Sequence, residues 1–212
     1  MEEQLIRIES DGMRMEGMLA MPDKPIGVVL FADGGGRLNP RNGEVSLALR
    51  KAGMGTLLLD LLSVAEEKDF YTRSDVTVLT QRLGRALDWL GQHGDSRGLP
   101  MGLFGASTGA AAALQLAAWR GSDIAALVSR GGKPDLAGRP ALEKVRAPTL
   151  LIAGGLDNDG LGVNRMAFTA LRCDKQLEVI NGAGAMFEEP GALAATTALA
   201  SSWFSQHFVG RA

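Results

Sequence analysis

The residues best suited to covalent chemistry form a G-x-S-x-G string, Gly105-Ala106-Ser107-Thr108-Gly109. The string follows an apolar run at 101–104 and opens an alanine-rich stretch, so it predicts a turn from a buried strand into a helix. Such a turn exposes the serine hydroxyl in a strained backbone conformation and needs small residues on either side. We therefore interpret Ser107 as a nucleophile, with a passive serine in a glycine-rich turn as the alternative.

Two other segments carry residues that acyl transfer requires. The glycines of Asp33-Gly34-Gly35-Gly36-Arg37 would let backbone N–H groups approach an oxyanion, although a phosphate-binding nest or a plain turn would look alike. Asp157 follows the apolar run 150–153 and comes later in the chain than Ser107, where the acid of a Ser…Asp…His triad is expected. Asp159 is a weaker candidate for that acid, and a helix-capping role is the alternative for Asp157.

Alternating and continuous apolar stretches predict the elements that position these residues. The predicted strands are 4–9, 13–21, 27–31, 56–59, 101–104, 124–128, 149–152 and 177–180, and the predicted helices are 43–52, 76–90, 110–120, 164–171 and 191–207. Asp11-Gly12 signals a hairpin turn between the first two strands, and Ser74 is a candidate N-cap for the second helix. The alternation predicts one α/β domain over residues 1–212, with an eight-stranded, mostly parallel sheet and helices on both faces. Ligands bind beyond the carboxyl ends of such strands, where all three segments lie.

Composition narrows the classes of function. The 212 residues carry a net charge of −2 with no basic stripe, so nucleic acid is not an expected partner. No apolar run reaches the ~18 residues of a membrane span, and the acidic start shows no secretory signal, so we expect no membrane association. A single cysteine, Cys173, suits a reducing compartment, and we expect a cytoplasmic protein. Two histidines and one cysteine offer no metal cluster, and we expect no cofactor.

The whole chain resembles the dienelactone hydrolase group of the α/β-hydrolase superfamily. The segments that carry the resemblance are 105–109, 128–132, 134–137, 148–152 and Phe187-Glu188-Glu189-Pro190-Gly191. The resemblance implies an α/β-hydrolase fold and cleavage of carboxylic esters or lactones through an acyl-Ser107 intermediate. It further implies Asp157 as the acid, and an oxyanion hole made by the N–H groups of Thr108 and of Gly35 or its neighbour Gly34.

The sequence departs from this family at two positions. Members commonly carry the catalytic histidine a few residues before the Phe-Glu-Glu-Pro-Gly run, and Ala185 occupies that position. Asp33 stands where a histidine commonly opens the oxyanion loop, and that loop is shortened. His93 and His207 are both expected at the opposite edge of the sheet. The triad therefore lacks its general base.

The further candidates for the pocket are Asp33, Arg130 and Met186. Asp33 could replace the base if burial raised its pKa, or it could be held as a structural carboxylate by a neighbouring arginine. Glu188 and Glu189 follow the vacant position, although a structural role is expected for them. Arg130 could bind an anionic substrate or form a loop salt bridge, and Met186 is expected beside Ala185.

These observations favour an impaired serine hydrolase of the carboxylic ester type. Its partner would be a small ester or lactone, and an anionic one is compatible with Arg130. The alternative is a catalytically silent binding protein or pseudoenzyme, and the missing histidine could equally have been lost naturally or replaced deliberately. The sequence fixes neither the substrate nor the oligomeric state, and a homo-oligomer is compatible with it.

Overall fold

The computed structural model describes residues 2–10, 12–33 and 36–209. Its strands are β1 (Glu2–Ser10), β2 (Met13–Met21), β3 (Val28–Ala32), β4 (Gly55–Leu59), β5 (Met101–Ala106), β6 (Ile124–Gly132), β7 (Thr149–Gly154) and β8 (Lys175–Ile180). Its α-helices are α1 (Pro40–Lys51), α2 (Val64–Lys68), α3 (Phe70–Arg73), α4 (Val76–Gln92), α5 (Ser107–Arg120), α6 (Arg139–Leu142), α7 (Asn158–Ala170) and α8 (Ala192–Phe208). Short 3-10 turns are η1 (Gly36–Leu38), η2 (Gly121–Asp123) and η3 (Pro134–Ala137). All eight predicted strands are present.

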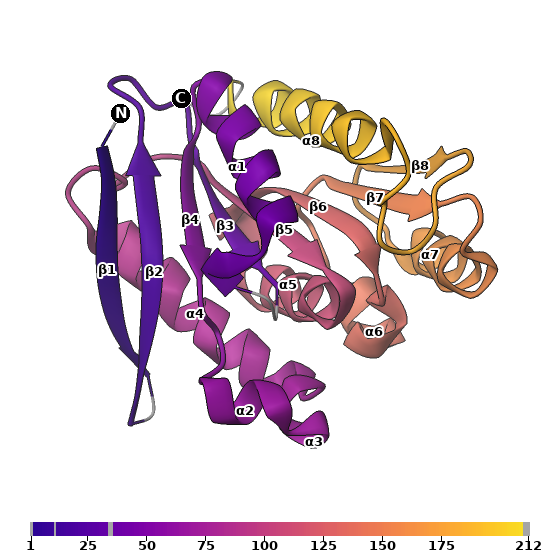
Figure 1. The fold of residues 1–212 in the computed structure, drawn as a ribbon, viewed down its shortest axis with the longest axis horizontal. Helices are drawn as coiled ribbons and strands as arrows, with labels where there is room; N and C mark the ends of the chain where they lie inside the picture. The colour runs from indigo at the N-terminus through magenta and orange to yellow at the C-terminus, as the bar shows by residue number, and fades with distance from the viewer. Residues whose placement is uncertain (1, 11, 34–35, 210–212) are drawn as a thin grey trace.

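The strands form one sheet in the order β1-β2-β4-β3-β5-β6-β7-β8 (Figure 1). β1 and β2 pair antiparallel, as do β2 and β4, whereas every pair from β4 to β8 is parallel. Ser10 pairs with Met13, so two residues connect the hairpin, and Gly12 has φ 79 as the predicted turn requires. Asp11 lies outside the described residues. The hairpin occupies one edge of the sheet, and β5 lies at its centre.

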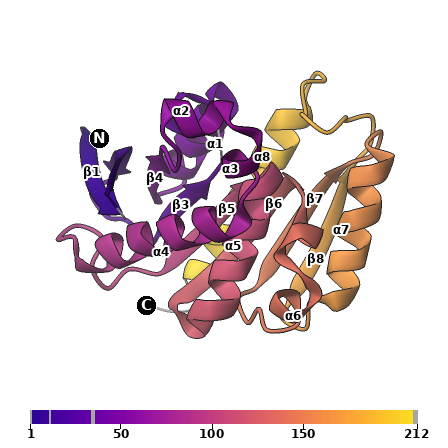
Figure 2. The ribbon, with the colours of Figure 1, turned by 90° about the horizontal axis from the view of Figure 1, so that it is seen from below.

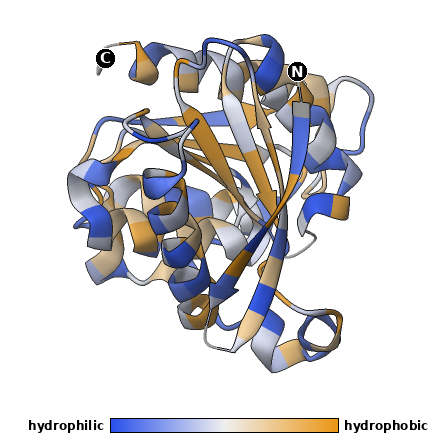
Figure 3. Cartoon of the chain, turned by 90° about the vertical axis from the view of Figure 1, so that its left-hand side faces the viewer, coloured by the Kyte–Doolittle hydropathy of each residue, from blue (hydrophilic) through white to orange (hydrophobic). Residues whose placement is uncertain are grey.

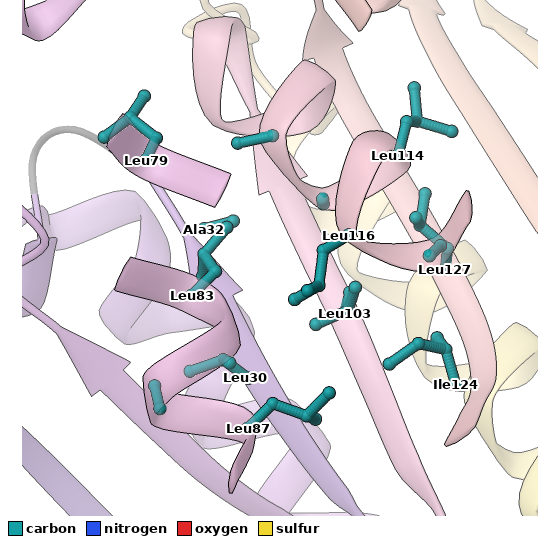
Figure 4. Packing of buried hydrophobic residues seen from close by; sticks show 14 of the residues in the cluster. Leu30, Ala32, Leu79, Leu83, Leu87, Leu103, Leu114, Leu116, Ile124 and Leu127 are labelled. Atoms are coloured by element: carbon teal, nitrogen blue, oxygen red, sulfur yellow. The ribbon is translucent and has the colours of Figure 1, made fainter. Parts of the chain in front are cut away.

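Helices cover both faces of the sheet (Figures 1 and 2). The core on one face includes side chains of α1 and α8, and the core on the other includes side chains of α4, α5 and α7. Apolar residues gather on the central strands (Figure 3). In α4, Leu90 continues the helical spacing of Leu79, Leu83 and Leu87, which Figure 4 labels. All four are buried, and each stabilises the fold by about 1.5–3 kcal/mol. The alanine-rich α5 allows close packing on β5 and β6 and fixes where Ser107 lies.

The helix predictions need three corrections. The N-cap of α4 is Asp75, whose carboxylate accepts from the N–H groups of Thr77 and Val78, whereas Ser74 ends α3. The helices α2, α3 and α6 were not predicted, because they have only four or five residues and α2 and α3 bury no side chain. α7 begins at Asn158, six residues before the predicted start, because Asp157 caps it.

Within the described part of the chain, no helix combines the length and apolar character needed to cross a membrane.

Candidate active site

Ser107 lies at the sharp turn between β5 and α5. It is the first residue of α5, its side chain is exposed, and its φ is 49, which confirms the predicted left-handed conformation. A non-glycine residue in this region costs about 1–3 kcal/mol and persists only where the surrounding fold enforces it. The turn therefore has the geometry of a nucleophile elbow.

Close backbone packing explains both glycines of the string. A methyl group at Gly109 would overlap the carbonyl of Ala32 at the end of β3, and one at Gly105 would come within 2.5 Å of Ala110 Cα. β6 supports the turn from the other side, because Ser107 pairs with Gly132 and its carbonyl accepts from the Lys133 N–H at 3.0 Å. The two neighbouring strands thus hold the elbow in place.

A cavity of about 570 Å³ opens beside Ser107, within the size range of small-molecule sites. Ser107, Thr108 and Gly109 form one wall of the cavity. Its apolar lining comes from Leu38, Leu62, Val64, Phe70 and Leu79, and its charged lining from Asp33, Asp60, Glu67, Arg73 and Lys133. The helices α2 and α3, which project from the body in Figure 1, supply Val64, Glu67, Phe70 and Arg73.

One of the expected oxyanion donors has a suitable position. Thr108 is the second residue of α5, so its N–H is among the first four that have no partner within the helix. The positive end of the helix dipole adds to the attraction for an oxyanion. Gly34 and Gly35 lie outside the described residues. The loop resumes at Gly36, where a φ of 52 and close contact with Asp60 require glycine.

An ion-pair network fixes this loop to the sheet. Arg37 Nε donates to Asp60 Oδ2 at 2.6 Å, its Nη2 donates to Glu16 Oε2 at 2.7 Å, and its backbone N–H donates to Asp60 Oδ1 at 2.9 Å. The hydrogen bond to Asp60 raises the pKa of the guanidinium, so Arg37 stays charged.

Asp33 lines the cavity, and its carboxylate is already engaged. Its side chain is buried, and Oδ2 accepts from Asn39 Nδ2 and from Asn42 Nδ2, both at 2.7 Å. Sequence reasoning expected an arginine as the partner that might hold Asp33. In the structure two amides donate to Asp33 and the positive charge of Arg130 interacts with it, whereas Arg37 binds Asp60 and Arg41 binds Glu188. These contacts hold the carboxylate at the cavity wall.

Arg130 does not line this cavity, contrary to the expectation of a pocket cation. It is only 5% exposed, its guanidinium lies 5.3 Å from the centre of the Phe104 ring, and Nη2 donates to Asn42 Oδ1 at 3.4 Å. Burial lowers the pKa of Arg130, and the negative charge of Asp33 opposes that shift. The side chain leaves β6 on the face of the sheet that α1 and α8 cover. The cations that do line the cavity are Arg73 and Lys133.

Asp157 caps α7, which is the alternative that the sequence left open. Its Oδ1 accepts from the Gly160 N–H at 3.1 Å, and Oδ2 has no hydrogen-bond partner in the described part of the chain. The loop carrying Ala185 is tied to this turn, because the Leu156 N–H donates to the carbonyl of Ala183 at 2.9 Å. The backbone of the Asp157 turn therefore lies beside the Ala185 loop, while the Asp157 carboxylate is turned toward Gly160.

Ala185 is exposed and lies on the same side of the sheet as Ser107. A methyl group at Gly131 would come within 2.8 Å of the Ala185 carbonyl, and the next residue, Gly132, pairs with Ser107. Phe187, with φ 54 and 2% exposure, packs its ring against Gly131 and anchors the loop. These contacts place the vacant position within two residue contacts of the serine, but Ala185 itself does not line the cavity, contrary to expectation.

Met186 was expected in the pocket, but its side chain is 51% exposed and does not line the cavity. The buried apolar residues of this loop are Ala183 and Phe187. Glu189 supports the loop as expected, because its Oε1 accepts from the Gly184 N–H at 2.9 Å.

Both histidines lie at the amino ends of the parallel strands, opposite the end that carries Ser107. His93 follows α4 and stacks on Trp89, 4.3 Å between ring centres, before the chain enters β5. His207 lies near the end of α8, 4.0 Å from Asp174, which directly precedes β8. β5 spans six residues, or about 20 Å, between that end and Ser107. Neither imidazole can serve Ser107.

The described residues contain no group of three or more His, Cys, Asp or Glu side chains arranged to hold a metal ion. Sequence reasoning missed the cavity side chains Phe70, Arg73 and Lys133. Their segments follow β4 and β6 at the carboxyl edge, and that position is the only signal the sequence offers for them.

The chain matches no protein-family model. It is 43% identical to a dienelactone hydrolase from Anabaena variabilis of known structure, with a TM-score of 0.93 over 97% of this chain and 98% of that one. An esterase domain from a Rhodothermus marinus protein, 18% identical, shares the fold with a TM-score of 0.79 over 98% of this chain and all of that one.

Two Mycobacterium tuberculosis sequences named "Putative phosphoribosyl transferase" are 44% identical over 207 residues, 97% of this chain. The chain spans about half the length of these curated relatives, 46%. Identity over almost the whole of the Anabaena enzyme shows that this chain belongs to the dienelactone hydrolase family of α/β-hydrolases.

Proposed function

We propose that the protein is a weak serine hydrolase that cleaves small carboxylic esters or lactones through an acyl-Ser107 intermediate. The observation that carries this proposal is the strained Ser107, at φ 49, on the wall of a cavity at the carboxyl end of the central strand. A fold maintains such strain mainly at functional sites.

In the proposed reaction the Ser107 Oγ attacks the carbonyl carbon, and the carbonyl oxygen becomes an oxyanion. The Thr108 N–H and the start of α5 stabilise that charge, together with the N–H of Gly34 or Gly35 by family resemblance. The serine proton has no imidazole to receive it, because Ala185 stands at the family's histidine position. A triad that has lost one member still accelerates hydrolysis about 10³–10⁴-fold over water through the oxyanion hole and binding.

The cavity favours a substrate with both an apolar and an anionic part. Leu62, Phe70 and Leu79 offer apolar contact, while Arg73 supplies positive charge at the cavity wall. We therefore place an anionic group of the substrate near Arg73, and not near Arg130.

A silent binding protein is the second candidate. It is favoured by the engaged state of the two carboxylates considered for catalysis: Asp33 accepts two amide donors, and Asp157 caps a helix. The phosphoribosyl transfer in the name of the longer relatives is given for whole proteins of which this chain matches only 46%.

Hydrolysis of p-nitrophenyl acetate, compared with Ser107→Ala, tests the proposal. We expect slow turnover by the unaltered protein that the substitution abolishes. Equal rates for the two proteins would favour the silent binding protein. Vigorous activity that is lost in Asp33→Asn and kept in Asp157→Asn would instead make Asp33 the base.

A further inference from the structure

We propose that Lys133 is the general base for Ser107 in this chain. The inference rests on the proposed hydrolase function and supplies the proton acceptor that the missing histidine leaves unassigned. Lys133 follows β6 directly, whereas the family's histidine position lies in the loop after β8.

The backbone holds Lys133 against the nucleophile. The Lys133 N–H donates to the Ser107 carbonyl at 3.0 Å, and the preceding Gly132 pairs with Ser107 as a parallel bridge. Gly132 itself is confined between Ser129 and Ala110, where a methyl group would overlap both. The start of the lysine side chain is therefore fixed beside the serine.

The Lys133 side chain is exposed, and it lines the same cavity as Ser107. Its ammonium group has no ion-pair or hydrogen-bond partner among the described residues, in contrast to Lys175, whose Nζ donates to the carbonyls of Phe168 and Leu171. A flexible four-carbon stem can bring an unengaged Nζ to the hydroxyl of a residue already in backbone contact.

The charged groups that line the cavity with Lys133 differ in whether they already have hydrogen-bond or ion-pair partners. Asp33 and Asp60 are engaged by the amides and by Arg37, as described above. Glu67 on α2 and Arg73 on α3 complete the charged lining. Neither Glu67 nor Arg73 forms an ion pair with Lys133 in the described part of the chain, so the lysine side chain is not held in a fixed position.

The chemistry balances with these residues alone. Neutral Lys133 takes the hydroxyl proton of Ser107 as Oγ forms its bond to the carbonyl carbon. The resulting ammonium returns that proton to the alkoxide as the ester C–O bond breaks. Water then attacks the acyl-serine and gives one proton to Lys133, which passes it to Ser107 as the acid is released. No metal, oxidant or other reactant is required.

Two substitutions separate this role from a purely electrostatic one. Lys133→Met removes both the charge and the base, whereas Lys133→Arg keeps the charge on a group that does not give up its proton. The assay is stopped-flow release of p-nitrophenolate from p-nitrophenyl acetate between pH 7 and about pH 10, approaching the titration of an ordinary lysine. The rate of Ser107→Ala is subtracted at each pH. Because Lys133 is exposed, both variants should unfold at the temperature of the unaltered protein.

We expect the Ser107-dependent rate to rise with pH, because only a neutral amine can accept the serine proton. At the highest pH both Lys133 variants should be about a hundredfold slower, the low end of what a positioned base contributes. A loss in Lys133→Met with full activity in Lys133→Arg would overturn the inference and make Lys133 a substrate-binding cation. Unchanged rates in both variants would overturn it while the proposed hydrolase function stands. If subtraction of Ser107→Ala leaves no activity at any pH, the proposed function fails and the inference with it.

Discussion

Replacing Ala185 with histidine should restore a general base to the site. Ala185 is exposed, so a larger side chain requires no rearrangement of the core. The turn that carries Asp157 contacts this loop, and its carboxylate, once rotated away from Gly160, can accept from the imidazole Nδ1–H and so orient Nε2 toward Ser107.

The size of the effect follows from these contacts. A positioned general base contributes about 10²–10⁴-fold, and we expect the low end, about a hundredfold, because the Asp157 carboxylate is already engaged in capping α7. A hundredfold gain corresponds to about 2.7 kcal/mol of transition-state stabilisation.

The assay is kcat/KM for p-nitrophenyl acetate at neutral pH. Ala185→Gln is the matched control, because glutamine fills similar space and accepts no proton. Adding Asp157→Asn to Ala185→His should remove most of the gain while keeping an N-cap acceptor for α7. The reasoning is refuted if histidine and glutamine give the same rate in folded proteins, or if the gain persists without the Asp157 charge.

Three further predictions concern the packing around the site and the reactivity of the lone thiol. Gly109→Ala should destabilise the protein by about 1–3 kcal/mol, because the methyl group overlaps a β3 carbonyl. By contrast, Gly43→Ala in α1, where a methyl group meets nothing within 4 Å, should stabilise it by about 0.5–1 kcal/mol; thermal unfolding that ranks the two in the reverse order would contradict this. The Arg82 hydrogen bond lowers the pKa of Glu66 from 4.5 to about 2, so the pair's contribution is complete above pH 4.5 and lost as the pH falls toward 2. The difference in melting temperature between the protein and Arg82→Met should therefore shrink across that range, and a constant difference would argue against the pair. Burial raises the pKa of Cys173, so its thiol should react with Ellman's reagent more slowly than free cysteine at neutral pH, and an equal rate would count against this reading.

Most of the fold could be predicted from the sequence, because buried strands and helices show a regular pattern of apolar residues. β3 to β7 are continuous apolar runs, and the leucines of α4 recur at helical spacing. α2 and α3 escaped prediction because they bury no side chain and so have no apolar period. Ser63 and Glu66 nevertheless form a capping box, and the Ser-x-x-Glu spacing is the signal that could have located α2.

At the site, local sequence sufficed where backbone geometry dictates residue type. The G-x-S-x-G spacing predicted the strain at Ser107 because only glycine fits at positions 105 and 109. Contacts between segments far apart in the sequence were harder to predict. That Asn39 and Asn42 hold Asp33 depends on how α1 follows its loop, and the approach of Lys133 to Ser107 depends on the pairing of β5 with β6. The direction of the Arg130 side chain could have been predicted, because strand alternation places it on the same face as Val128, away from Ser129.

The most direct test of the central claim is to treat the unaltered protein with a fluorophosphonate and map the modified residue by peptide mass spectrometry. We predict slow modification of Ser107 alone, accelerated in Ala185→His by about the same hundredfold factor as ester hydrolysis. Modification of other residues with Ser107 untouched would contradict its assignment as the nucleophile. Immediate stoichiometric labelling of Ser107 in the unaltered protein would contradict the claim that loss of the family's histidine impairs the site.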